Sequence, residues 1–61
     1  MTNETAPRSS AYWLDKAEEA RTRSEGMHDG VAAATLIRLA EFYAVMARRA
    51  AAREAREGQK L

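Results

Sequence analysis

Three residues near the middle of the chain have the side-chain types of a nucleophilic triad: Ser24, His28 and Asp29. Such a triad needs a His that acts as general base, a carboxylate that orients it, and preorganised donors for the oxyanion. Here the three residues fall around an exposed turn between two expected helices, where nothing excludes water. The sequence therefore predicts a protein that is not an enzyme.

Carboxylate-pair and metal chemistry are also disfavoured by the spacing. Glu18 and Glu19 are adjacent, and adjacent side chains on a helix point about 100° apart. His28 is the only His and the chain has no Cys, whereas a structural zinc ion takes four ligands. We expect no cofactor and no metal, and we interpret His28 as an exposed loop residue.

Basic side chains gather toward the C-terminal end of the chain. They are Arg48, Arg49, Arg53, Arg56 and Lys60. Cations in the last turns of a helix offset the negative end of its dipole, which accounts for such a cluster without a ligand. The alternative is that the four Arg contact phosphate groups of a nucleic acid or an acidic protein partner. Glu54 and Glu57 lie among them and no aromatic residue follows Tyr43 to stack on bases, so nucleic acid ranks below protein as a partner.

The length and composition allow one small domain that needs outside support. The chain has 61 residues, no Cys and a net charge of +1, and Ala supplies half of its 46% hydrophobic residues. A chain this short buries only about 60% of the surface that its unfolded form exposes. Small scaffolds are usually stabilised by disulfides, a metal or a partner chain. Without Cys or a metal pattern, a partner chain is the remaining option.

Membrane segments and targeting signals are not expected. A membrane-spanning helix needs about 20 apolar residues, and the longest uncharged run in the periodic region, residues 30–37, ends at Arg38. The first five residues lack the basic flank and apolar segment of a signal peptide. A membrane-surface helix ranks below nucleic-acid binding because the large apolar residues stop at Met46, before the Arg cluster begins. We expect a cytoplasmic location and no membrane contact.

The residues that could position any site form two helices of unequal length. We expect a flexible tail over residues 1–9, a helix over 10–25, a turn over 26–29, a helix over 30–57 ended by Gly58, and a tail over 59–61. Ser9 or Ser10 is the expected N-cap of the first helix, and Asp29 that of the second. Gly26 is expected in the left-handed C′ conformation, with Met27 making the hydrophobic contact of a Schellman motif.

The short turn makes the two helices antiparallel neighbours in a helical hairpin. The expected hairpin core is Trp13, Ala17, Ala20, Leu36, Leu39, Tyr43 and Met46. Folding back from the turn brings Trp13 close to Tyr43. In this register the N-terminal end of the first helix lies level with about Val45 of the second helix. The second helix therefore extends about 18 Å beyond the first.

The second helix carries two seams with heptad spacing. The first is Ala32, Leu36, Leu39, Tyr43, Met46 and Ala50, and the second is Ala33, Ile37, Ala40, Ala44, Ala47 and Ala51. If the first seam packs inside the hairpin, the second is left as a self-association seam where small side chains let another helix approach. This predicts a homodimer, an antiparallel four-helix bundle of coiled-coil type. The alternative is that these Ala residues reflect helix propensity alone.

Residues 12–50 also carry a recognisable pattern. The matching pieces are Trp13, Lys16 to Arg21, Met27-His28-Asp29, Leu36, Leu39 to Tyr43 and Met46 to Ala50. This pattern resembles a group of short proteobacterial helical-hairpin proteins of uncharacterised function. The resemblance implies a bacterial helical hairpin and no particular activity. Where that group begins its second helix with Asp-Pro, this chain has Asp29-Gly30, which is less preorganised for a helix start.

Overall fold

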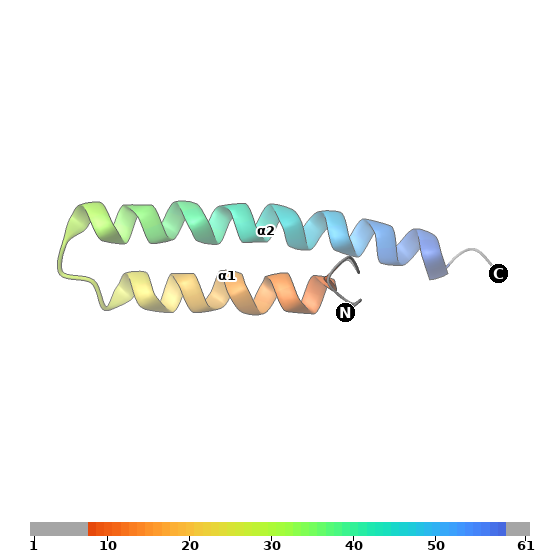
Figure 1. Cartoon of the computed structure of the whole chain (residues 1–61), viewed down its shortest axis with the longest axis horizontal. Helices are drawn as coiled ribbons and strands as arrows, with labels where there is room; N and C mark the ends of the chain where they lie inside the picture. The colour runs from red at the N-terminus through yellow and green to blue at the C-terminus, as the bar shows by residue number, and fades with distance from the viewer. Residues whose placement is uncertain (1–7, 59–61) are drawn as a thin grey trace, which may run out of the picture.

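The computed structural model describes residues 8–58, and these form two antiparallel α-helices (Figure 1). Helix α1 spans Ser10–Glu25 and helix α2 spans Gly30–Gly58. The helices pack against each other as a single layer, and the smallest dimension of the molecule is 13 Å. The expected all-α hairpin with a longer second helix is confirmed. Residues 1–7 and 59–61 of the expected tails lie outside the described residues.

Both helices begin at residues whose side chains accept hydrogen bonds from the first turn. The Ser9 hydroxyl accepts from the amide of Tyr12 at 3.2 Å, so Ser9 is the N-cap of α1. At the start of α2, Oδ1 of Asp29 accepts from the amide of Val31 at 2.9 Å. Each contact satisfies an N–H group that has no partner within its own helix, and both expected caps are confirmed.

The end of α1 differs from the expected Schellman motif. Gly26 has φ −92° and ψ 1°, and no glycine of the described residues has a positive φ. The amides of Gly26 and Met27 instead donate to the carbonyls of Arg23 and Ser24, at 3.1 and 3.2 Å. These bonds reach back three residues and tighten the last turn into a 3₁₀-type end. The expectation of a left-handed Gly26 was therefore wrong, because its φ is negative and α1 ends with bonds of 3₁₀ type.

The surface that α2 presents to α1 lies between the two expected seams. Each position of the second seam follows a position of the first by one residue, so the seams are about 100° apart on the helix. The buried residues of α2, Ala40, Ala47 and Ala50, alternate between them, and half-buried residues continue the same spacing. They form a stripe that we call the inner stripe: Ala33, Leu36, Ala40, Tyr43, Ala47, Ala50 and Glu54.

The matching stripe on α1 also has heptad spacing and consists mostly of small residues. It is Ser10, Trp13, Ala17, Ala20 and Ser24. The buried side chains at the contact are five Ala and Ser24. Small side chains at a helix contact allow the two axes to approach closely. The side chains that are fully enclosed between the helices are therefore all small.

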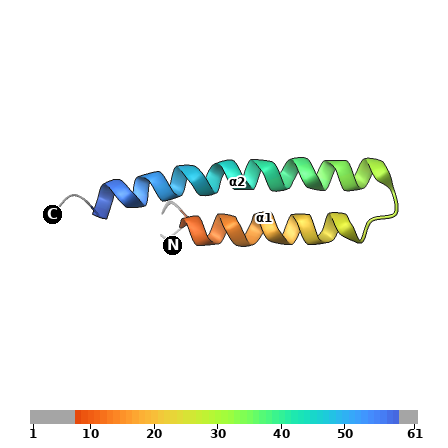
Figure 2. The ribbon, with the colours of Figure 1, turned by 180° about the vertical axis from the view of Figure 1, so that it is seen from behind.

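The register places α1 farther along α2 than expected. The N-terminal end of α1 contacts Arg53 and Glu54, whereas the expected register ended α1 near Val45. The loop runs past the end of α1 before α2 begins, so that α2 extends beyond α1 at the turn as well as at its own C-terminal end (Figures 1 and 2). The free C-terminal segment of α2 is therefore shorter than expected, and Trp13 and Tyr43 do meet, with ring centroids 5.8 Å apart.

Candidate interaction site

The expected core residues are distributed over three degrees of burial. Ala17 and Ala20 are buried, and Leu39 is 38% exposed. The other four are half-buried: Trp13, Leu36, Tyr43 and Met46. Leu39 differs from the expectation because it lies outside the inner stripe. Most of the large apolar side chains thus border the contact between the helices without being enclosed by it.

Four aromatic rings form a continuous cluster along one side of the hairpin. Tyr12 and Trp13 meet edge to face with centroids 5.0 Å apart, Trp13 contacts Tyr43, and Phe42 lies 6.0 Å from Tyr43. The Arg8 guanidinium lies 4.7 Å from the centre of the Tyr12 ring. Aromatic pairs of this kind contribute about 0.5–1.5 kcal/mol beyond their area burial. The cluster joins α1 to α2 where the helix contact contains only small side chains.

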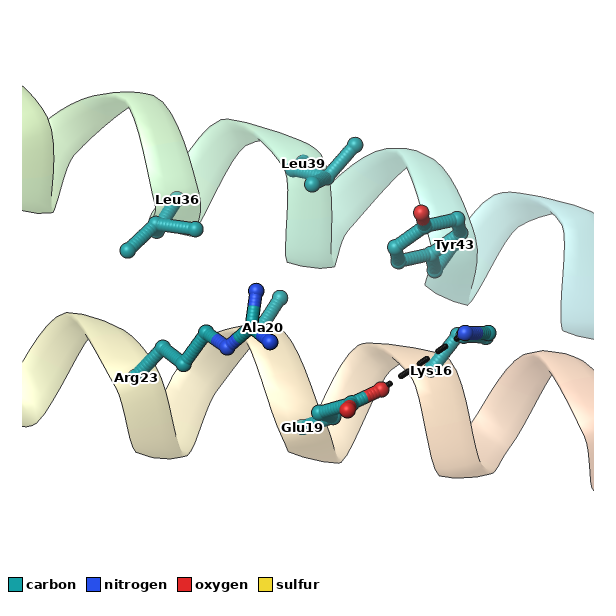
Figure 3. A pocket seen from close by; sticks show the side chains of 7 residues that line it. All are labelled: Lys16, Glu19, Ala20, Arg23, Leu36, Leu39 and Tyr43. Atoms are coloured by element: carbon teal, nitrogen blue, oxygen red, sulfur yellow. Dashed lines mark ion pairs between the residues drawn. The ribbon is translucent and has the colours of Figure 1, made fainter.

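A hollow of about 120 Å³ lies on the same side of the hairpin (Figure 3). It is lined by Leu36, Leu39 and Tyr43 from α2 and by Lys16, Glu19, Ala20 and Arg23 from α1. Leu36 points toward α1, and the ion pair between Lys16 and Glu19 at 3.7 Å lies along the α1 edge (Figure 3). The hollow therefore has an apolar wall on α2 and a charged rim on α1.

A second, shallower groove of about 260 Å³ lies near the N-terminal end of α1. Its lining is mostly apolar: Ser10, Leu14, Ala44, Ala47, Arg48 and Ala51. The groove exists because the Ala side chains on α2 are too short to fill the space beside Leu14. It contains three members of the expected self-association seam.

The fold buries some members of the expected self-association seam and exposes others, so the expectation of one continuous contact surface needs correction. Ala40 and Ala47 are buried between the helices at 1% and 4% exposure. Ala33 and Ala44 are half-buried, and Ile37 and Ala51 are exposed. Because two central members already pack within the hairpin, the seam as a whole cannot be the contact between chains.

The Arg cluster is also divided. The Arg53 guanidinium donates to the backbone carbonyl of Arg8 at 3.0 Å and lies 3.9 Å from the Glu57 carboxylate. Arg48, Arg49 and Arg56 are exposed. Arg53 is therefore partly occupied by contacts within the chain, and the other three keep the exposure that a contact with phosphate or an acidic partner would require.

Glu54 makes the most specific polar contact between the helices. Its carboxylate accepts from the amide and the hydroxyl of Ser10, each at 2.8 Å. These two donors, the amide first, hold the pKa of Glu54 below its ordinary value. No local pattern marks this pair, because its members are 44 positions apart, and sequence reasoning did not find it.

Ser24, His28 and Asp29 do not converge on a common point. The buried Ser24 hydroxyl donates to the carbonyl of Arg21 at 2.7 Å, and Asp29 caps α2. His28 is an exposed loop residue. Ser24 and Asp29 thus serve the backbone at the two ends of the turn. Glu18 and Glu19 are both exposed, and among residues 8–58 no group of three or more His, Cys, Asp or Glu is placed to hold a metal ion.

By length and composition, α2 is long and apolar enough to cross a membrane. An 18-residue stretch of it has a mean hydropathy of 1.4, and 11% of that stretch is buried. The sequence analysis did not anticipate this property, because it considered only the uncharged residues 30–37, which end at Arg38. Buried core helices of soluble proteins and signal sequences have the same length and composition, so this property alone does not assign a membrane span.

The fold and its surfaces define a class: a small, all-α helical hairpin with large apolar side chains exposed on its surface. No protein-family model, curated protein or solved structure matches the chain. The resemblance to short proteobacterial hairpin proteins stays a prediction.

Proposed function

We propose that this chain is a small, non-enzymatic interaction module that works as a homodimer, two hairpins forming a four-helix bundle. The helices of such a bundle would pack with coiled-coil spacing, and the location would be the cytoplasm of a bacterial cell. A further, unidentified protein would bind the assembled module. The proposal gives exposed apolar side chains of the hairpin a partner.

One observation carries this proposal: the described residues bury no large side chain completely. Their buried set is five Ala and Ser24. Six large apolar side chains, meanwhile, are exposed by 38–76%: Leu14, Met27, Val31, Ile37, Leu39 and Phe42.

A second layer would resolve this imbalance. Stable domains usually bury their apolar faces between packed layers of secondary structure, and this hairpin is a single layer. The entropy cost of ordering each residue is offset mainly by apolar burial. A second hairpin supplies the missing layer without any other component.

The nucleic-acid alternative rests on Arg48, Arg49, Arg53 and Arg56. Arg53 already contacts Arg8 and Glu57, which weakens the set. The alternative is tested by adding the protein to fluorescently labelled RNA and DNA at low salt. Binding that disappears steeply as salt rises would support it, and we expect no binding.

Sedimentation equilibrium over a wide concentration range tests the homodimer, with far-UV circular dichroism on the same samples. We expect a helical dimer that dissociates on dilution into hairpins that are less stable but still helical. A helical monomer at every concentration would overturn the proposal. A poorly helical monomer would also overturn self-association and would favour folding on a different protein, which a pull-down would then identify.

A further inference from the structure

We propose that the second copy docks antiparallel along one particular stripe of α2, with Phe42 at its centre. The stripe precedes the inner stripe by one residue at every position, and we call it the outer stripe: Ala32, Thr35, Leu39, Phe42, Met46, Arg49 and Arg53. This inference rests on the proposed self-association and specifies its contact.

The outer stripe has the spacing of a second helix contact. Its members recur at steps of three and four, so they lie on one side of α2, about 100° from the side that meets α1. Leu39 and Phe42 are 38% and 55% exposed, and Met46 is half-buried. The centre of the stripe is therefore large and apolar, and the hairpin leaves much of it exposed.

The charges along α2 favour a second copy in the antiparallel direction. Residues 29–45 carry two acidic side chains and one basic one, whereas residues 46–58 carry four Arg and two Glu. A parallel copy would place Arg49 and Arg53 against the same Arg residues of its partner, and juxtaposed like charges are costly. An antiparallel copy places them against Thr35 and Ala32, near the carboxylate of Asp29.

The shape of the stripe suits a closed two-fold contact. A two-fold axis close to Phe42 brings the Phe42 rings of the two copies together and pairs Leu39 of each copy with Met46 of the other. Such an interface is self-complementary and ends at a dimer. The hollow bordered by Leu36, Leu39 and Tyr43 lies beside this centre (Figure 3) and leaves room for the second copy. Lys16, Glu19 and Arg23 would form the polar rim.

Two substitutions that truncate similarly exposed side chains test whether the outer stripe, and not another part of the surface, is the contact between copies. Phe42→Ala removes the centre of the outer stripe, whereas Ile37→Ala acts on a residue that is 46% exposed and points about 140° away from Phe42 on the helix. By sedimentation equilibrium we expect Phe42→Ala to weaken dimerisation at least about tenfold and Ile37→Ala to change it less than about threefold.

The outcomes distinguish this inference from the proposed function. A wild-type dimer that is weakened by Ile37→Ala and not by Phe42→Ala overturns the outer stripe and leaves self-association standing. A monomeric wild-type protein overturns both. If the wild-type protein is monomeric and floats with vesicles of phosphatidylcholine and phosphatidylglycerol, the exposed apolar side binds a membrane and the second copy is excluded.

Disulfide cross-linking tests the direction, because the chain has no Cys of its own. We expect Phe42→Cys to cross-link with itself under mild oxidation and Ile37→Cys not to do so. Ala32→Cys and Arg53→Cys should form a mixed disulfide when the two variants are combined, and neither should cross-link alone. Self-cross-linking of Ala32→Cys would show a parallel arrangement and overturn the proposal, since a disulfide requires Cβ atoms about 4 Å apart.

Discussion

Ser10 and Glu54 join the two ends of the hairpin through a pair of hydrogen bonds. The Ser10 amide donates to one carboxylate oxygen of Glu54 and the Ser10 hydroxyl to the other, each at 2.8 Å. The carboxylate thus satisfies an amide in the first turn of α1 and lies at the positive end of the α1 dipole. Because the buried side chains are small and similar to one another, this contact and the Trp13–Tyr43 contact distinguish the observed register from a register shifted by one turn.

The Ser10–Glu54 contact makes stability depend on pH. Ser10 lowers the pKa of Glu54 in the folded state, so the contact stabilises fully above the ordinary Glu pKa of about 4.3. The contribution is lost as the pH falls through the lowered folded pKa. We expect the wild-type protein to melt at a higher temperature than Glu54→Gln at pH 7, and the difference to disappear in strong acid.

The matched control for this prediction is Glu57→Gln. Glu57 also lies on α2, and among the described residues its one ion pair is with Arg53, at 3.9 Å; its side chain is 65% exposed. Exposed ion pairs contribute little, so we expect almost no change in melting temperature at any pH. Melting must be compared at one protein concentration, because dimerisation would shift it. An equal loss in both variants at pH 7 would contradict a special role for Glu54.

A larger side chain at position 40 tests how closely the two helices approach each other. Ala40 is 1% exposed, and a larger side chain there would push the helices apart. We expect Ala40→Leu to lower the free energy of unfolding by about 1–3 kcal/mol, measured by urea denaturation. Ala52→Leu, at an exposed position of the same helix, should change it by less than about 0.5 kcal/mol.

The result with Ala40 also separates two ways of packing α2. If Ala40 faced a second copy, as the sequence suggested, Ala40→Leu would weaken the dimer and leave an isolated hairpin intact. In the observed fold the substitution acts within the hairpin, so helicity is lost even at concentrations where the protein is monomeric. Circular dichroism at high dilution tells the two apart.

Trp13 anchors the aromatic cluster from α1. Its ring is half-buried and contacts both Tyr12 and Tyr43. Complete burial of a Trp would make its removal cost about 3–5 kcal/mol; for a half-buried ring we expect Trp13→Ala to cost about 2 kcal/mol. Thermal unfolding measures this loss, and Leu14→Ala, which removes a side chain 57% exposed from the same helix, should cost less than half as much. An unchanged melting temperature in Trp13→Ala would contradict the Trp13–Tyr43 contact.

Features that depend on local patterns, such as the helix caps, could be predicted from the sequence. Features that depend on how the two helices pair could not. Ser9 and Asp29 were identifiable as caps because a cap acts within its own first turn. The side of α2 that meets α1 was not identifiable, because two apolar seams one residue apart are equally regular.

The structure selects the stripe between those seams. Ala40 and Ala47 allow close approach there, while Leu36 and Tyr43 still reach across to α1. The Ser10–Glu54 contact was not predictable for a related reason, since it exists only in this register. Phe42 belongs to neither expected seam, although the spacing of Leu39, Phe42 and Met46 is itself a heptad signal.

Gly26 tests how α1 ends. A left-handed glycine there would make Gly26→Ala destabilising by roughly 1–2 kcal/mol, the cost of that conformation for a residue with a Cβ. In the observed fold φ is −92° and an added Cβ would lie 3.8 Å from the Arg23 carbonyl oxygen, an ordinary contact. We therefore expect Gly26→Ala to leave the free energy of unfolding unchanged or raise it by up to about 1 kcal/mol, because Ala reduces the entropy of the unfolded chain.

Gly30→Ala provides the comparison for Gly26→Ala, since Gly30 is the first residue of α2 and an added Cβ would meet nothing within 4 Å. It should stabilise by about 0.4–1 kcal/mol through the same entropy effect. Urea denaturation of both variants at one protein concentration measures the two changes. If both variants are as stable as the wild-type protein or more stable, the result agrees with a 3₁₀-type end of α1. If Gly26→Ala is destabilised while Gly30→Ala is stabilised, Gly26 is left-handed after all and the loop follows a different path.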